Sequence, residues 1–186
     1  MIDSLGPACG TELENAGTAI NFFAALRILR VSPLIIAHVT KNEGRENAPC
    51  SVFGSSFFSN LTRAIWEVRA SRWPGTSDRG VSLHHRKGNN SRLYPPVAFH
   101  FGFANGGIQV RRQDVSTDAQ LASGLSQPDR VLAALKHGKL STGDLATEID
   151  APEDSTRKAA GRLEKRGLIR KFPDGWALVA RESETE

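Results

Sequence analysis

The sequence predicts an α/β protein, in which a mixed sheet with flanking helices is followed by a small, mostly helical domain. Two stretches carry this prediction. The first is Pro33–Lys41, PLIIAHVTK, a nearly continuous apolar run of the kind found in parallel strands buried on both faces. The second is residues 129–179, where three helical segments precede two short strands separated by a turn.

Length and charge set the next limits. The chain has 186 residues, with 24 Lys and Arg against 20 Asp and Glu, and this mildly basic balance permits nucleic-acid binding. Its two cysteines, Cys9 and Cys50, form no disulfide framework and favour a reducing compartment. We find no apolar stretch near the roughly 18 residues of a membrane span and no basic leader. We therefore expect a cytoplasmic protein without a membrane partner.

The N-terminal elements follow a strand–helix–strand order. Met1–Ser4 reads as the end of a strand, and Gly6-Pro7 as a turn. Thr11-Glu12-Leu13-Glu14 forms a capping box that opens a helix reaching about Arg30. With the strand at Pro33–Lys41, this order predicts a βαβ crossover and a parallel pair of strands.

The middle of the chain alternates between apolar and polar residues. After the polar loop Lys41–Pro49, Ser51 or Ser55 caps a helix that runs to about Ala64. Asn105-Gly106 predicts a tight hairpin between the last two of four strands. The four predicted strands are Ile65–Ala70, Val81–Arg86, Val97–Phe103 and Gly107–Val115.

These N-terminal motifs carry a family resemblance. Ile2–Gly6 (IDSLG), the helix after it, and LIIAHVTK followed by FGSSFFSNLTRAIWEVRA resemble the C-terminal half of a RecA-type P-loop ATPase core. The RepA-like and DnaB-like replicative helicases are the group that they resemble most. The resemblance covers roughly residues 1–115, and it implies a truncated RecA-like mixed sheet as a domain of residues 1–116. It also implies ATP and Mg²⁺ as cofactors.

The resemblance assigns roles to single residues. Asp3 matches the Walker B aspartate, which holds Mg²⁺ through water, with Ser4 beside it at the nucleotide. His38 matches the γ-phosphate sensor, and Asn42–Phe53 matches a mobile DNA-facing loop. Lys87 matches the first basic residue of a Lys-x-Arg or Lys-x-Lys pair that reaches the nucleotide of a neighbour in a homo-oligomeric ring. The second member of that pair would be Asn89, which is not basic.

The chain departs from the family at the phosphate-binding loop. No GxxxxGK[ST] motif occurs, so the matched region begins at Walker B, and we expect no ATP hydrolysis by this chain alone. The chain would then be a truncated product, a product with a misassigned start, or one half of a split protein with a missing N-terminal half as partner. From the residues alone, Asp3 can also be a surface or capping aspartate, His38 a core histidine, and Lys87 part of a basic loop.

The C-terminal segment resembles a different family. Residues 117–128 are rich in Ser, Ala, Asp and Gly and are predicted to be a linker. In residues 129–186, three helices and a hairpin occur in the order of a winged helix-turn-helix. The stretch STRKAAGRLEKRGLIRKF is typical of the recognition helix and first wing strand of that family.

Charge in this domain is concentrated on the third helix and the strand after it. Residues 155–171 carry seven basic residues against Glu164 alone, while residues 129–186 as a whole carry eleven of each sign. This segregation predicts phosphate contacts, although a solvated helix face in a protein-binding module would have the same pattern. The residues predicted to bind DNA are Arg157, Lys158, Arg162, Lys165, Arg170 and Lys171.

Two functions follow from these patterns. The first is the C-terminal part of a DNA-dependent RecA/RepA-like ATPase or replicative helicase that carries a DNA-binding winged helix. The alternative is a stand-alone winged-helix DNA-binding regulator whose α/β part mediates oligomerisation or senses a ligand.

Overall fold

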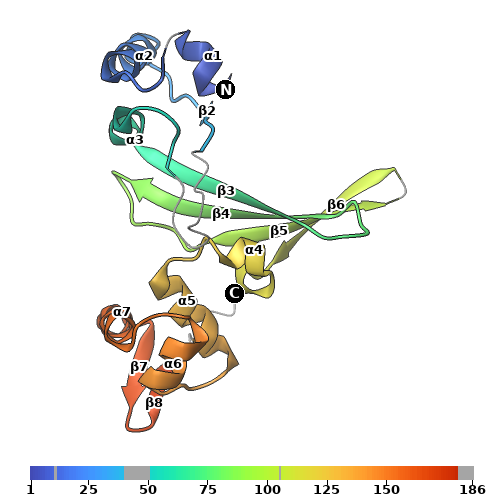
Figure 1. The fold of residues 1–186 in the computed structure, drawn as a ribbon, viewed down its shortest axis with the longest axis vertical. Helices are drawn as coiled ribbons and strands as arrows, with labels where there is room; N and C mark the ends of the chain where they lie inside the picture. Colours follow the sequence, from blue (N-terminus) through green and yellow to red (C-terminus); the bar gives the residue numbers. More distant parts are fainter. Residues whose placement is uncertain (11, 40–50, 105, 180–186) are drawn as a thin grey trace, which may run out of the picture. The chain divides into compact units, whose positions relative to one another are not determined.

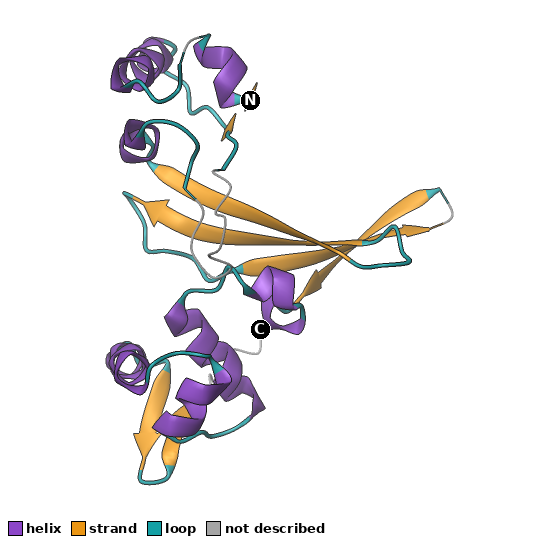
Figure 2. Cartoon of the chain, viewed as in Figure 1, coloured by secondary structure: helices purple, strands orange, loops and turns teal. Residues whose placement is uncertain are grey.

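The computed structural model describes residues 1–10, 12–39, 51–104 and 106–179 (Figure 1). Its helices and strands confirm a mixture of α and β structure but not the predicted mixed sheet, because the parallel and antiparallel pairs of the described strands lie in separate sheets. The described strands form a four-stranded antiparallel sheet and two separate two-stranded sheets (Figure 2). The chain divides into two compact units, the first made of residues 1–68 and 83–94, the second of 69–82 and 95–186. None of the described helices is long and apolar enough to cross a membrane.

The first unit is built around a parallel pair of very short strands. Ile2 lies opposite Ile35 and Asp3 opposite Ile36, which confirms the predicted parallel pairing of the two strands. Leu5, Ala19 and Phe58 are buried together in the core of this unit. Its elements are β1 (Ile2–Asp3), α1 (Leu5–Cys9), α2 (Ala16–Ile28), β2 (Ile35–Ile36) and α3 (Ser56–Leu61).

The helices of this unit differ from the prediction at their starts. The helix α1 includes Gly6-Pro7, which the sequence predicts as a turn. Pro7 is tolerated there because the first turn of a helix needs no backbone N–H donor. The helix α2 begins later than predicted, capped by the side chain of Asn15, which accepts from Gly17 N–H at 2.7 Å. Thr11 of the predicted capping box lies outside the described residues.

The prediction that Pro33–Lys41 is buried on both faces is wrong. Leu34, Ile36 and Val39 are 65%, 41% and 51% exposed. The strand β2 contains two residues and pairs with β1, and Ile35 and Ala37 pack against the core of the first unit, while Leu34, Ile36 and Val39 stay exposed. The polar loop Lys41–Pro49 lies outside the described residues.

The four-stranded sheet confirms the strands predicted in the middle of the chain. Its order is β3-β4-β5-β6, so each strand lies beside its neighbour in sequence. Ala104 lies opposite Gly107 at the predicted hairpin, and Gly106 has a φ of 72°, which favours glycine. Asn105 lies outside the described residues. The strands are β3 (Ala64–Arg72), β4 (Arg79–Gly88), β5 (Val97–Ala104) and β6 (Gly107–Gln113).

Residues 117–128, predicted to be a linker, are instead folded onto the second unit. They contain α4 (Ala119–Ala122), which follows the 3₁₀ helix η1 (Val115–Thr117). Leu121 and Leu125 are buried and pack with Ala98 of β5. Asp118 accepts hydrogen bonds from the Ser71 hydroxyl and the Trp73 indole N–H, both at 2.7 Å. Burial opposes its ionisation, but these bonds and the Leu121 N–H lower the pKa of Asp118.

The C-terminal part of the second unit confirms three helical segments followed by a hairpin. One buried cluster joins all of them, with Val131, Leu145, Leu163, Ile169 and Trp176 among its members. The elements are α5 (Gln127–Ala134), η2 (Leu135–His137), α6 (Thr142–Glu148), α7 (Glu153–Lys165), β7 (Ile169–Phe172) and β8 (Gly175–Leu178).

Candidate nucleic-acid interface

The helix α7 has one buried side and one exposed side. Its apolar and small residues recur at spacings of three and four, which places them on a single stripe. Thr156 is fully buried, and its hydroxyl donates to the Pro152 carbonyl at 3.1 Å. The other buried members of this stripe are Ala159, Ala160 and Leu163. The core therefore fixes which side of α7 faces outward.

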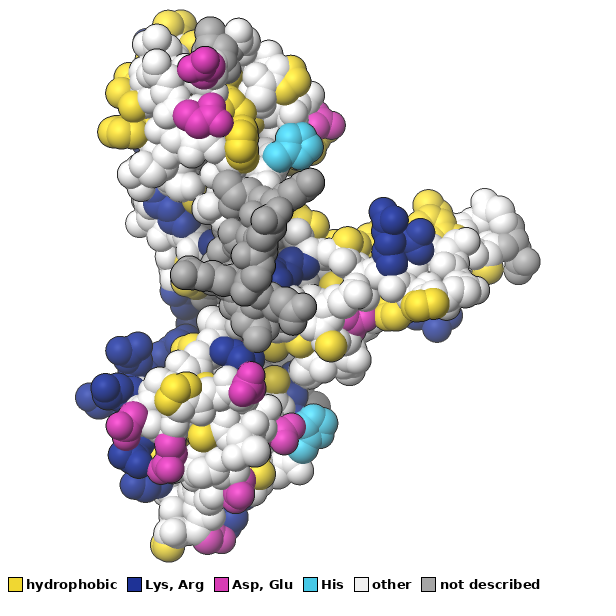
Figure 3. Space-filling view, in the orientation of Figure 1, with side chains coloured by type: hydrophobic (Ala, Val, Ile, Leu, Met, Phe, Trp, Pro, Cys, Tyr) yellow, Lys and Arg dark blue, Asp and Glu magenta, His cyan; other side chains and the backbone are white. Residues whose placement is uncertain are grey.

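The outward side of α7 is basic. Lys158, Arg162 and Lys165 are all exposed, and within the described part of the chain none of them forms an ion pair. Arg170 of β7 is likewise exposed. Lys and Arg side chains gather on the side of the second unit where α7 lies (Figure 3). We call Lys158, Arg162, Lys165 and Arg170 the basic face.

Two other residues predicted to bind DNA are engaged inside the domain. Arg157 pairs with Glu153 at 2.8 Å and with Asp154 at 3.1 Å, so its charge is compensated by the first turn of its own helix. The Lys171 ammonium lies 5.5 Å from the centre of the Trp176 ring, a cation–π arrangement. These contacts separate Arg157 and Lys171 from the four residues of the basic face.

The hairpin β7–β8 is held at a fixed position relative to α6. Leu140 and Trp176 exchange backbone hydrogen bonds of 3.1 and 2.8 Å, which adds a one-residue bridge beside β8. The Trp176 indole N–H donates to the Thr142 hydroxyl at 3.0 Å. At Gly175 a Cβ atom would lie 2.4 Å from the Leu140 carbonyl oxygen, and φ is 145°, so only glycine fits.

The predicted nucleotide residues lie in the first unit. Asp3 is exposed at the end of β1, and His38 is exposed two residues beyond β2. Ser4 precedes α1 without capping it through its side chain. The His38 carbonyl accepts from Phe53 N–H at 2.9 Å. Of the predicted DNA-facing loop Asn42–Phe53, residues 42–50 lie outside the described residues.

The structure does not assemble a metal centre from the residues it describes. Among them, no group of three or more His, Cys, Asp or Glu side chains could hold a metal ion. Asp3 and His38 share no hydrogen bond or ion pair within the described ranges. The predicted water-mediated Mg²⁺ contact of Asp3 therefore stays a prediction.

Lys87 has a different environment from the one predicted. It lies within β4, which continues to Gly88, rather than in a loop after the strand. Its ammonium donates to the carbonyls of Ser59 and Asn60, both at 2.8 Å. These carbonyls belong to the last turn of α3, where a cation is favoured by the helix dipole. Lys87 thus stabilises the C-terminal end of α3.

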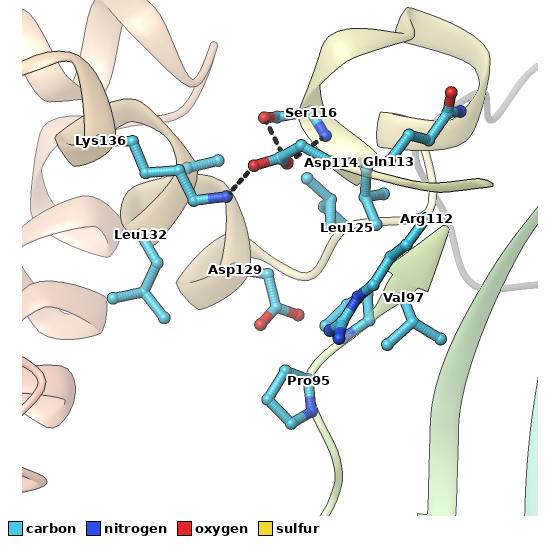
Figure 4. Close-up of a pocket in the computed structure, with 13 residues that line it drawn as sticks. Pro95, Val97, Arg112, Gln113, Asp114, Ser116, Leu125, Asp129, Leu132 and Lys136 are labelled. Carbon is cyan, nitrogen blue, oxygen red and sulfur yellow. Dashed lines mark hydrogen bonds and ion pairs between the residues drawn. The ribbon is translucent and has the colours of Figure 1, made fainter. Parts of the chain in front are cut away.

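Sequence reasoning missed an ion pair beside a cavity of about 430 Å³ in the second unit (Figure 4). There the Lys136 ammonium donates to Asp114, which also accepts from Ser116 N–H at 2.9 Å. The Lys136 hydrogen bond is the largest cause, and the Ser116 N–H the next, of a lowered pKa of about 2 for Asp114. Lys136 and Asp114 are 22 residues apart, so helical spacing could not have paired them.

Sequence reasoning also missed an aromatic cluster in the first unit. Trp66, His85 and Tyr94 lie with near-parallel rings. The alternation of β3 does place Trp66 on the opposite face from Glu67, but His85 comes from β4 and Tyr94 from the segment between β4 and β5, so the sequence alone does not bring the three together.

Known proteins give no guidance on this geometry. No family model, no curated protein and no solved structure matches the chain.

Proposed function

We propose that this chain is a DNA-binding protein in which residues 127–179 act as a winged helix-turn-helix and α7 enters the major groove. The observation that carries the proposal is the basic face, with Lys158, Arg162 and Lys165 exposed and without ion-pair partners among the described residues. Uncompensated cations on one side of a helix attract the phosphate backbone and release its counterions.

The distribution of charge supports this proposal over a solvated helix face. Residues 129–186 carry eleven basic and eleven acidic residues, yet seven of the basic ones fall within residues 155–171. A helix that only needed solubility would mix both signs along its outer side. Of the three acids of α7, Glu153 and Asp154 lie in the first turn, where they pair with Arg157, and Glu164 accepts from Lys171 N–H at 3.2 Å.

The order and packing of the elements also support it. The chain runs from α5 to α6, α7 and the hairpin β7–β8, with Leu140 bridged to Trp176 beside the hairpin. This is the order of a winged helix-turn-helix. In this arrangement Arg170, the member of the basic face on the first wing strand, contacts phosphates beside the groove.

The proposal is tested by titrating the full-length chain with duplex DNA at several salt concentrations. Lys158→Ala, Arg162→Ala and Lys165→Ala should each weaken binding to all sequences, and each should lower the salt slope by about 0.9 per lost phosphate contact. Arg27→Ala is the matched control, because it removes one exposed cation from α2 in the first unit. If the α7 variants bind like Arg27→Ala, α7 does not contact DNA.

We also propose that the chain is the C-terminal part of a RecA/RepA-like DNA-dependent ATPase or replicative helicase. The observation that favours this second function is the parallel pairing of β1 and β2. Asp3 is the last residue of β1 and His38 follows β2, so both are at the carboxyl ends of these strands, where ligands bind in open α/β sheets. The hydrogen bond from Phe53 to the His38 carbonyl supports a link between a γ-phosphate sensor and a DNA-facing loop.

Nucleotide binding gives this second proposal a direct test. Because the GxxxxGK[ST] motif is absent, we expect calorimetry with ATP and Mg²⁺ to detect no micromolar binding by the chain alone. Tight binding that disappears in Asp3→Asn would contradict that expectation. Translation of the coding DNA upstream of Met1 separates the two functions. An in-frame strand with GxxxxGK[ST] supports the ATPase, and any other sequence supports a winged-helix regulator whose α/β part mediates oligomerisation or ligand sensing.

A further inference from the structure

Three aromatic rings lie together in the first unit, far from α7 in sequence. The Trp66 and His85 rings are 4.5 Å apart between centroids and inclined by 6°. Tyr94 lies 5.5 Å from His85 and 6.2 Å from Trp66, at 22° and 16°. All three distances fall in the range of offset-stacked aromatic pairs. We call Trp66, His85 and Tyr94 the aromatic platform.

The platform is not a core cluster. Trp66 is 43% exposed and Tyr94 53% exposed, whereas His85 beneath them is 7% exposed. A structural hydrogen bond fixes the inner ring, because His85 Nδ1 accepts from Tyr94 N–H at 3.1 Å. A Cβ at Gly88 would lie 2.9 Å from the His85 ring, so glycine leaves the ring its space. The two outer rings, Trp66 and Tyr94, therefore stack on a buried ring and are open to solvent.

The charge around the platform is positive. Across residues 62–68 and 83–94 the basic residues are Arg63, Arg86, Lys87 and Arg92, and the one acid is Glu67. Glu67 follows Trp66 directly, so it points to the opposite face of β3. There it is 6% exposed and pairs with Arg86 at 2.6 Å. The backbone bond from Asn89 N–H to the Arg63 carbonyl, 2.9 Å, holds Arg63 beside the β4 end.

We propose that the aromatic platform binds single-stranded nucleic acid. Bases stack on Trp66 and Tyr94, while the exposed guanidinium groups of Arg63 and Arg92 contact the phosphates. Exposed aromatic rings with cations and no exposed acid are the combination that binds single strands without sequence preference. A protein partner with an apolar surface would gain little from the flanking cations. This surface is distinct from α7 and does not depend on duplex binding by that helix.

The test uses the full-length chain with fluorescently labelled oligo-dT and oligo-rU of equal length, followed by anisotropy. Trp66→Ala and Tyr94→Ala should each weaken binding by about tenfold. Phe103→Ala is the matched control, because Phe103 is an equally exposed aromatic, 44%, on β5. Trp66→Phe, which keeps an aromatic face, should retain most of the affinity, so a loss in Trp66→Ala through misfolding is recognised.

Arg92→Ala tests the phosphate contact separately from base stacking. It should lower the salt slope of single-strand binding by about 0.7, a change that loss of stacking alone would not cause. Arg27→Ala, which removes an exposed cation outside both proposed nucleic-acid surfaces, should leave single-strand binding unchanged. The platform variants keep every residue of the basic face, so the duplex titration tests the α7 proposal separately and the two failures are distinguishable. Tighter binding of oligo-dT assigns the platform to DNA, and tighter binding of oligo-rU assigns it to RNA. Absence of single-strand binding, or equal affinities of Trp66→Ala and Phe103→Ala, would overturn the inference.

Discussion

Asp114 shows how one residue joins two parts of the second unit. It caps η1 by accepting from Ser116 N–H, and it pairs with Lys136 at the end of the helical segment α5–η2. Its lowered pKa of about 2 means that the folded protein favours the ionised carboxylate, chiefly through the Lys136 hydrogen bond. A group with a lowered folded pKa contributes stability above its ordinary pKa, and that contribution is lost as the pH falls through the folded value.

Asp114→Asn should therefore destabilise the chain at neutral pH but not near pH 2. Asparagine keeps the cap on η1 and removes only the charge. Because both partners of the ion pair are well exposed, screening limits the expected loss to about 0.5–1 kcal/mol. Urea unfolding of wild type and variant at pH 6 and near pH 2 measures it. A difference in the free energy of unfolding that is the same at both pH values would contradict this account of Asp114.

At the scale of elements, the local sequence pattern was enough to predict those helices and strands that are determined by their own residues. The alternation of β3 to β6 and the Asn-Gly turn gave the four-stranded sheet, and periodicity gave the buried stripe of α7. The basic face follows from the same periodicity. The ion pair that takes Arg157 out of the basic face could also have been predicted, because Glu153 lies four residues earlier on the same side of α7.

The elements that were missed depend on residues distant in sequence. Residues 117–128 look like a linker, but Leu121 and Leu125 find a buried site against β5. Pro33–Lys41 looks doubly buried, but among the described strands its strand β2 pairs with β1 alone. Lys87 resembles a nucleotide-reaching lysine, but its acceptors are carbonyls 27 and 28 residues earlier.

Lys87 gives a prediction at this scale. Lys87→Met keeps the length of the side chain and removes the two hydrogen bonds to the end of α3, so we expect a loss of about 1 kcal/mol in the free energy of unfolding. Lys158→Met is the matched control, because Lys158 is exposed and unpaired among the described residues. Urea unfolding compares the three proteins. Unchanged stability in Lys87→Met would mean that its ammonium is free to serve a neighbouring subunit.

At the scale of the whole molecule, the first unit leaves much of its apolar surface uncovered. Ile28 is 80% exposed, Leu34 65% and Val31 63%. The parallel pair β1–β2 adds two strand edges that no other described strand covers. Contiguous apolar surface and open strand edges both recruit other chains. Within residues 1–39, the other exposed large apolar side chains are Met1, Ile20, Leu29, Ile36 and Val39.

We therefore expect the chain to self-associate through its first unit. Sedimentation velocity over a range of concentrations should show reversible growth of the sedimenting species. Ile28→Lys and Leu34→Lys should shift it toward the monomer, whereas Ile108→Lys, at an equally exposed site, 64%, on β6 of the second unit, should not. Association driven by apolar surface persists as the salt concentration is raised. Association driven by the basic residues would weaken, because added salt screens interactions between exposed charges. A monomer at every concentration would show that the exposed apolar side chains of the first unit are too dispersed to bind another copy.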